Sequence, residues 1–345
     1  MISGERVRSV LSSLLASAPF TALASRRSGT ASIFMFHRFL PEAHGHDPVV
    51  VRRFLDWLRR NRFEVLDLEE LFRRLRGEGP PLRRAVALTL DDGYSCQAEI
   101  GAPIFAEFDA PVTTFLTTGF VDGTIWMWWD QIEYVFEHTR VPRVQVTAGG
   151  QRMDHDLSTP DRRRGATHVL QMCCKNLPQA ERLAAIAELT EAARVAIPET
   201  PPPQYRPMTW EQARRCEAGG MRFGPHTVTH PILARTDDSQ ARQEIEGSWA
   251  RLRAEVSRPV PVFCYPNGLR CDFGAREVSL LTRLGLVGAV TAEPGYAATE
   301  GFGEGTAAFR VPRFCFSERH DENLRYASGL EWLWEKVRFR HPIAS

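Results

Sequence analysis

The chain has 345 residues, enough to bury a sizeable core, and its 43% hydrophobic and 25% charged residues are typical of a soluble globular protein. A formal net charge of +1 argues against a nucleic-acid binder that works by neutralising many phosphates. The seven cysteines are scattered and never spaced C-x-x-C, so neither a disulfide framework nor a zinc knuckle is indicated. Basic residues are almost all arginine, which is typical of a GC-rich bacterial genome. We therefore expect a bacterial protein of a reducing, cytoplasmic compartment.

Residues 1–30 permit two interpretations. Arg6 and Arg8 precede a moderately apolar segment, and the Ala-Leu-Ala triplet at 22–24 could imitate a signal-peptidase site. Serine, threonine and proline interrupt that segment, and the odd number of thiols disfavours export. An amphipathic or disordered segment, free or resting peripherally on a membrane surface, is therefore favoured over a cleaved signal peptide. The sequence has no run of eighteen apolar residues, so we expect no membrane-spanning helix.

Along the rest of the chain, short apolar runs alternate with helical patterns, which predicts an α/β fold with a largely parallel sheet. In chain order, the strands are expected at 32–36, 85–90, 112–116, 222–223, 262–265 and 288–291. The helices are expected at 51–61, 68–76, 210–218, 239–256 and 276–284.

A block from about residue 122 to residue 206 interrupts this alternation. It contains an aromatic cluster, a hairpin signal at Gly149-Gly150 and a helical stretch over 159–197, and it ends near three consecutive prolines. We interpret it as a largely helical insertion in a main domain that spans 31–316. Residues 317–345 are expected to form a C-terminal helical tail.

Two adjacent carboxylates, Asp91 and Asp92, follow the expected strand 85–90, and Gly93 lets the backbone turn sharply after them. If both faced one cavity, repulsion would raise the proton affinity of one of them unless a cation lay between them. With a metal present, one aspartate would ligate it and its neighbour would act as a base on the bound water. A plain Asp-Asp-Gly turn at a strand end is the alternative.

Two histidines four residues apart, His226 and His230, form a second cluster. Pro225 and Pro231 flank them, so at most one helical turn fits between them. This favours a loop or a single turn at a strand end over the long helix of an H-E-x-x-H protease, whose glutamate is also absent. The pair is either a metal-binding element or two unrelated histidines near the surface.

The third cluster, Tyr265-Pro266-Asn267-Gly268, is a turn that follows the strand 262–265 and could aim backbone amides at an oxyanion. By itself it is only a turn. All three clusters lie at the carboxyl ends of expected strands, where parallel α/β folds place their chemistry. The sequence therefore predicts one metal-dependent hydrolytic site.

Together these clusters resemble the polysaccharide deacetylases of the NodB-homology family. T-L-D-D-G at 89–93 resembles the family's T-F-D-D-G, H-T-V-T-H at 226–230 resembles its H-[ST]-x-x-H, and F-C-Y-P-N-G at 263–268 stands where it has R-P-P-Y-G or Y-P-x-G. The similarity spans about residues 30–316 without the insertion. It implies a distorted (β/α) barrel and a substrate that is an N-acetylated sugar of a glycan or glycan precursor.

The resemblance also implies roles for single residues. A divalent metal, usually zinc, would be bound by Asp92, His226 and His230. Asp91 would be the general base that takes a proton from the metal-bound water, and the backbone amide of Asn267 would help to hold the developing negative charge.

The sequence departs from the family pattern at two positions, the arginine that orients the catalytic aspartate and the late histidine. Cys264 stands where many members have an arginine that orients the catalytic aspartate, and the late L-x-x-H histidine has no clear counterpart. His37, in M-F-H-R-F at the end of the first strand, resembles the Y-H element of a branch in which a first-strand histidine takes that place. We expect His37 to be the general acid; a histidine that merely anchors the strand end is the alternative.

Aromatic residues could contribute to substrate binding. Trp128 and Trp129, together with Trp126, could stack on sugar rings, or they could form a packed seam between insertion and barrel. Tyr265 is a further substrate-binding candidate. Two other functions stay open, namely a glycan-binding pseudoenzyme and a hydrolase of another amide or an O-acyl ester. The intact Asp91 speaks against the pseudoenzyme.

Overall fold

The computed structural model describes residues 28–40 and 45–331. The chain divides into two units: a main unit, up to Asp122 and from Pro207 onward, and an insertion unit, Gly123–Arg206. The predicted N-terminal segment lies outside the described residues except at 28–30, and the predicted tail is described only to residue 331. In the described ranges, no helix has both the length and the apolar character needed to cross a membrane.

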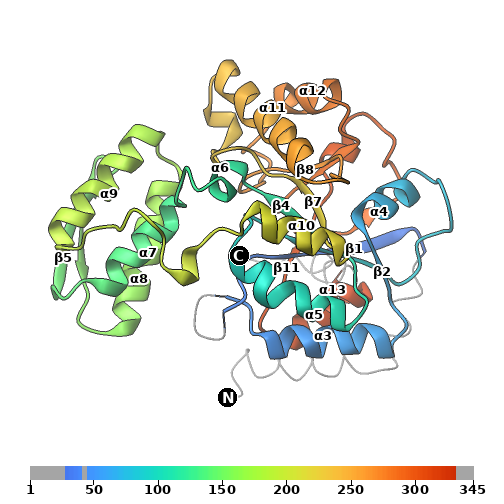
Figure 1. Ribbon diagram of the computed structural model, residues 1–345, viewed down its shortest axis with the longest axis horizontal. Coiled ribbons are helices and arrows are strands. Elements are labelled where there is room, and N and C mark those ends of the chain that lie inside the picture. Colours follow the sequence, from blue (N-terminus) through green and yellow to red (C-terminus); the bar gives the residue numbers. More distant parts are fainter. Residues whose placement is uncertain (1–27, 41–44, 332–345) are drawn as a thin grey trace, which may run out of the picture. The chain divides into compact units, whose positions relative to one another are not determined.

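A mostly parallel sheet forms the centre of the main unit (Figure 1). Its strand order is β10-β1-β3-β4-β7, with β2 also paired to β3 and β11 also paired to β1. The seven strands are β1 (Thr30–Phe36), β2 (Glu64–Leu66), β3 (Ala85–Leu90), β4 (Val112–Leu116), β7 (Arg222–Pro225), β10 (Ala297–Ala298) and β11 (Phe314–Cys315). Only β10 runs antiparallel to its neighbour.

A second parallel pair, β8 (Val262–Cys264) and β9 (Gly288–Val290), continues the circuit. Isolated bridges join Phe223 to Pro259 on one side of the pair and Val290 to Val311 on the other. The hydrogen-bond ladders therefore do not close completely, as expected of a distorted barrel. The predicted α/β fold class is confirmed.

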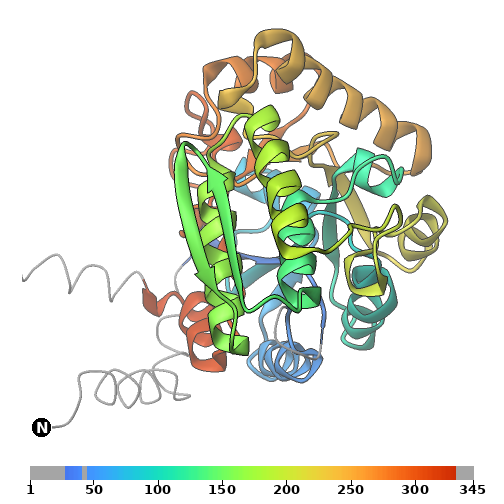
Figure 2. The same ribbon diagram turned by 90° about the vertical axis from the view of Figure 1, so that its left-hand side faces the viewer.

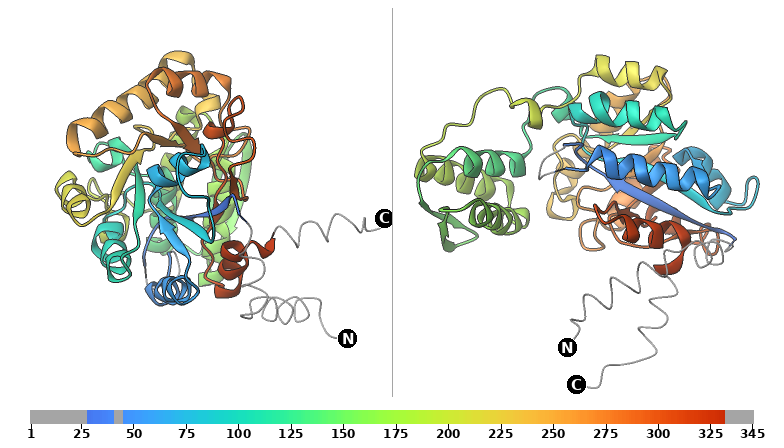
Figure 3. Two further views of the ribbon diagram at one scale, coloured as in Figure 1. Left: turned by 90° about the vertical axis from the view of Figure 1, so that its right-hand side faces the viewer. Right: turned by 90° about the horizontal axis from the view of Figure 1, so that it is seen from below.

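Helices surround these strands (Figure 3). They are α3 (Pro48–Arg60), α4 (Leu68–Leu75), α5 (Ala102–Glu107), α6 (Thr118–Val121), α10 (Trp210–Ala218), α11 (Asp238–Glu255), α12 (Ala275–Arg283) and α13 (His320–Ser328). Helices cover the strands, and β3 and β4 are buried along their whole length, which explains why threonine is their only polar residue type. A polar N-cap starts α3, where the Asp47 side chain accepts a hydrogen bond from the Val49 N–H.

The insertion unit has a hydrophobic core of its own. Figure 2 shows its helices and its hairpin. The unit contains α7 (Trp128–His138), the hairpin of β5 (Arg143–Ala148) and β6 (Gln151–Asp156), α8 (Pro160–Lys175) and α9 (Gln179–Ala193). Gly149 and Gly150 form the hairpin turn with φ of 59° and 73°, as a two-residue type I′ turn requires. The helical stretch predicted over 159–197 is thus two helices, with Pro178 as the N-cap of the second.

Candidate functional site

The two aspartates lie immediately after β3 and are both buried, with exposed fractions of 3% for Asp91 and 4% for Asp92. The Asp91 N–H donates to the Phe36 carbonyl, which continues the ladder between β1 and β3. The chain then turns sharply, with φ of 80° at Asp92 and 94° at Gly93. A Cβ on Gly93 would lie 2.8 Å from the Leu116 side chain, so this turn requires glycine.

The two histidines lie at the end of β7 and on the turn that follows. Thr227 and His230 have φ of 65° and 59°, so the segment is a strained turn and not a helix. The His226 Nδ1 is 2.8 Å from the Cys264 carbonyl oxygen and donates to it, which directs Nε2 toward Asp92. The Asp92 Oδ1 lies 3.6 Å from the His226 Nε2 and 3.5 Å from the His230 Nε2.

This set of donors fits a divalent metal of the zinc type. Ligand atoms of Asp92, His226 and His230 all lie within 4.8 Å of one another. Ligands about 2.0–2.1 Å from a tetrahedral centre are separated by roughly 3.4 Å, close to the spacing found here. Burial lowers the pKa of both histidines below the ordinary value, so both rings are neutral at pH 7, the form that binds metal.

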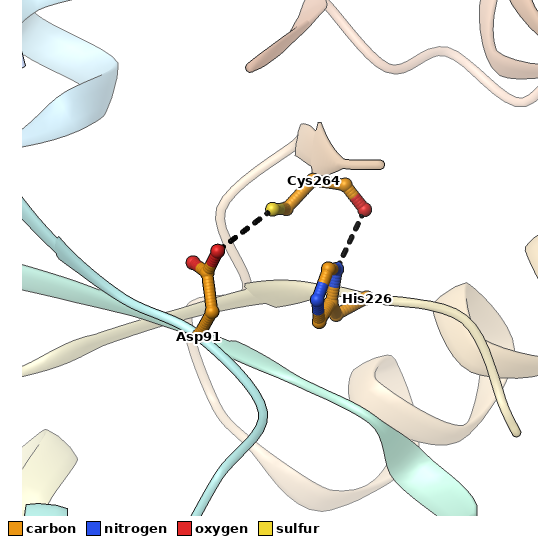
Figure 4. A group of neighbouring side chains, drawn as sticks. All are labelled: Asp91, His226 and Cys264. Atoms are coloured by element: carbon orange, nitrogen blue, oxygen red, sulfur yellow. Dashed lines mark hydrogen bonds between the residues drawn. The ribbon is translucent and has the colours of Figure 1, made fainter. Parts of the chain in front are cut away.

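A second group, Asp91, His226 and Cys264, also brings potential ligand atoms within 4.8 Å (Figure 4). The Cys264 thiol lies 3.5 Å from Asp91, and its carbonyl oxygen already accepts the His226 Nδ1–H. Burial raises the pKa of the Cys264 thiol well above its ordinary value, so the thiol is protonated at pH 7. This group therefore suits a metal less well than Asp92 and the two histidines.

Arg313 is a site residue that the sequence motifs missed. Its Nη1 and Nη2 lie 2.8 Å from the Asp91 Oδ1 and Oδ2, a bidentate pair in which Arg313 is 1% exposed. The guanidinium also lies 3.0 Å from the Thr89 hydroxyl, 2.9 Å from the Thr291 carbonyl and 3.1 Å from the Cys264 sulfur. Burial would raise the pKa of Asp91, but the guanidinium outweighs it and holds that pKa well below its ordinary range. The arginine absent at position 264 is thus replaced from position 313.

His37 lies at the end of β1, next to the same cluster. The Gln97 side-chain amide donates both to the His37 carbonyl, at 2.7 Å, and to the Asp91 carbonyl, at 2.5 Å, which ties the two strand ends together. The His37 side chain is exposed to solvent, and partial desolvation by the surrounding protein lowers its pKa below the ordinary value, against the opposing effect of Asp91. Its imidazole is therefore neutral at pH 7.

The Tyr265 to Gly268 turn has two different parts. Asn267 has φ of 58° and is half-buried, and its N–H donates no hydrogen bond within the described part of the chain. Gly268 fixes the turn through its carbonyl, which accepts from the Ala292 N–H at 3.0 Å. Tyr265 is 1% exposed and stacks on Phe273 with 3.7 Å between ring centres. Its side chain packs in the core, which does not fit a direct contact with substrate.

Trp128 and Trp129 belong to the insertion unit. Their rings meet edge to face with 5.4 Å between centres, and the Arg182 guanidinium lies 4.7 Å from the Trp128 ring centre. Trp128 also packs against the core of the insertion. Stacking of these rings on a sugar stays a prediction.

Comparison with known proteins finds one similar family. A family model described as polysaccharide deacetylase matches residues 181–287, a range that contains both histidines and the Tyr265 to Gly268 turn. No curated protein sequence matches the chain.

Solved structures of similar fold cover most of the chain. The Streptococcus pyogenes deacetylase PplD in complex with acetate has a TM-score of 0.57 and 17% identity, over 88% of this chain and 99% of that one. IcaB from Ammonifex degensii has a TM-score of 0.56 and 14% identity, over 88% and 98%. BC0361, a polysaccharide deacetylase from Bacillus cereus, has a TM-score of 0.53 and 12% identity, over 87% and 69%. The chain is therefore similar to polysaccharide deacetylases in the sequence of residues 181–287 and shares the fold of these solved structures, and the aspartates and histidines gathered at its strand ends support the same family.

Proposed function

We propose that this protein is a metal-dependent deacetylase that removes acetyl from an N-acetylated sugar of a glycan or glycan precursor. The observation that carries the proposal is the pairing of two buried groups, the Asp92, His226 and His230 donor set and, directly beside it, a carboxylate held by Arg313. The similar fold of PplD, described in complex with acetate, supports it, because acetate is the product expected here.

Asp92, His226 and His230 would hold one zinc-type ion. When bound, such an ion would polarise the acyl carbonyl and lower the pKa of a coordinated water. The hydrogen bond from the His226 Nδ1 to the Cys264 carbonyl would fix the ring in its ligating orientation.

Asp91 would accept the proton of the attacking water as the water oxygen bonds to the carbonyl carbon. Its low pKa makes it a weak base, but it also keeps the carboxylate ionised at every pH of interest. Arg313 occupies one lone pair on each carboxylate oxygen and fixes the plane of the group. The carboxylate is therefore prealigned, which reduces the reorganisation needed for proton transfer.

The Asn267 N–H is the backbone donor suited to the negative charge that develops on the carbonyl oxygen. Main-chain hydrogen bonds hold its turn from both sides, since the Tyr265 N–H donates to the Val290 carbonyl and the Gly268 carbonyl accepts from the Ala292 N–H. The donor would thus be in place before the reaction begins.

Cleavage of the C–N bond requires a proton on the leaving amine, and we assign this step to His37. A neutral imidazole can donate its N–H to the amine while its other nitrogen takes up a proton. We therefore propose that His37 relays to the amine the proton that Asp91 takes from water. The proton count balances: one proton of the water reaches the nitrogen and completes the amino group, and the second stays on the acid product until acetic acid ionises and passes it to the amine or to solvent, which leaves acetate.

Replacement of His37 by alanine is expected to lower kcat by about 10²- to 10⁴-fold, the usual contribution of a proton donor. Zinc affinity should stay within about threefold of wild type, because His37 is outside the ligand set. Steady-state acetate release and calorimetric zinc titration measure the two effects. His168→Ala, an exposed histidine on α8, is the control. Near-normal turnover in His37→Ala would leave His37 as a strand anchor only.

Acetate release from a panel of acetylated glycans tests the function itself. The panel pairs N-acetylated with O-acetylated forms of a polymer, an oligosaccharide and a lipid-linked precursor. The proposal predicts release from an N-acetylated member, loss of release on chelation, and recovery with zinc. Preference for the O-acetylated forms would indicate an esterase, and binding without release would indicate a pseudoenzyme.

A further inference from the structure

A buried carboxylate from a distant helix holds the turn between the two histidines. Glu244 on α11 is 5% exposed, and its Oε2 accepts hydrogen bonds from the N–H groups of Val228 and Thr229, each at 2.8 Å. Its Oε1 accepts the Thr229 hydroxyl. One side chain thus satisfies three donors of a five-residue segment that begins and ends with a candidate metal ligand.

The turn needs such support because its backbone is strained. Thr227 and His230 both lie in the left-handed region, which β-branched residues such as threonine rarely adopt. Strained residues of this kind persist only where the surrounding structure fixes them. His230 is one of the strained residues, so the direction of its ring depends directly on the conformation of the turn.

Other contacts hold the turn from the opposite side. The N–H groups of Thr118 and Gly119 on α6 donate to the carbonyls of Thr227 and Val228, at 3.1 Å and 2.9 Å. The α6 contacts therefore bind the carbonyls of the turn, and Glu244 binds its amides.

The backbone of α11 approaches the turn closely. Gly247 lies one turn of helix after Glu244, and a Cβ there would come within 3.1 Å of the Val228 side chain. The helix therefore packs directly against the turn, and Glu244 is the residue through which it makes polar contact.

We propose that Glu244 is a positioning residue for the metal site. Its three hydrogen bonds fix the strained turn so that the Nε2 atoms of His226 and His230 both face the Asp92 Oδ1, at 3.6 Å and 3.5 Å. This inference rests on the proposed metal site. It goes further in assigning part of the metal affinity to a residue of α11 that touches no ligand atom.

Calorimetric titration of the full chain with zinc tests the proposal. Glu244→Ala removes all three hydrogen bonds, and Glu244→Asp shortens the side chain by one methylene. Both are expected to weaken zinc binding by about 10- to 100-fold. Glu244→Gln should stay within about threefold of wild type, because its carbonyl oxygen can accept both N–H groups while the Thr229 hydroxyl rotates to accept from its amide. Glu246→Ala, on the same helix, is the matched control.

The outcomes separate the two levels of inference. Wild type that binds no zinc would contradict the proposed function. Wild type that binds zinc, with the Ala and Asp variants within about threefold of it, would overturn the role of Glu244 alone. If Glu244→Gln loses as much zinc affinity as Glu244→Ala, the hydrogen-bond explanation is overturned in favour of a charge effect. If Glu244→Ala does not fold, the zinc affinities of Glu244→Asp and Glu244→Gln still test the role of Glu244.

Discussion

Asparagine in place of Asp91 is expected to lower kcat for acetate release by about 10²- to 10⁴-fold while zinc affinity stays near that of wild type. The amide has almost the shape of the carboxylate but cannot accept the proton of the attacking water. Asp91 is not part of the donor set around Asp92, so the metal should remain bound. Acetate kinetics and zinc titration of the same preparation measure both quantities.

The neighbouring residue provides the matched comparison. Asp92→Asn is expected to lose zinc affinity, because a neutral amide replaces the only anionic ligand in the set. The two adjacent carboxylates should therefore give different results: Asp91→Asn should lose turnover alone, and Asp92→Asn should lose metal binding. Equal loss of zinc in both variants, or normal turnover in Asp91→Asn, would contradict the separate roles assigned to them.

Removal of the Arg313 guanidinium is expected to have the largest effect on stability. Arg313→Ala would leave Asp91 as a buried carboxylate without its partner, which typically costs about 3–5 kcal/mol in free energy of unfolding at pH 7. Urea unfolding of the metal-free protein measures this quantity. Arg310→Ala is the control, because Arg310 is exposed and its main contact is with the face of Phe273.

The pH dependence of this deficit has a definite sign. In wild type the folded-state pKa of Asp91 lies below the ordinary value of 3.8, so the pair stabilises fully above that pH and less as pH falls through the folded-state pKa. In Arg313→Ala, burial without the guanidinium should raise that pKa above 3.8. Protonation of Asp91 would then remove the unpaired buried charge, so the stability lost in the variant would decrease as pH falls.

The deficit of Arg313→Ala should accordingly be smaller at pH 5 than at pH 8. It should also be smaller in the double variant Asp91→Asn/Arg313→Ala, which has no buried charge to leave unpaired. A deficit that is equal at both pH values and unchanged in the double variant would assign the effect to lost side-chain volume.

The parts of the site that follow expected strands could be predicted from sequence. Residues 85–90 and 112–116 are buried along their whole length in a parallel sheet, so they are short segments of apolar residues and threonine, a composition that favours strands. The polar residues that follow β3 and β7 then had to meet at one end of the sheet. For this reason strand placement sufficed to predict that the aspartates and histidines share one site, whereas the choice of Asp92, His226 and His230 as metal ligands came from the family resemblance.

Arg313 could not be found in this way. It precedes β11, a strand of two residues that is too short to show any periodicity, and it pairs with a carboxylate 222 positions earlier in the chain. One signal was available, because Arg313 is a lone charge between Pro312 and the apolar Phe314. A charged residue that enters a buried strand usually has a buried partner.

Glu244 and Tyr265 show the limits of residue type as evidence. Glu244 lies in a predicted helix rich in charged residues, where an acidic side chain is normally solvated, yet it is buried against the histidine turn. Tyr265 lies in a predicted site motif, yet its ring stacks in the core. In both cases the direction of the side chain decides the role, and that direction depends on packing between distant segments.

The most direct test of the central claim is a zinc-edge anomalous diffraction measurement on crystals of the zinc-loaded protein. The predicted result is one strong peak within bonding distance of the Asp92 carboxylate and the Nε2 atoms of His226 and His230. Asp91 should still be paired to Arg313. A peak at another set of residues, or none at this site in a preparation that releases acetate, would contradict it.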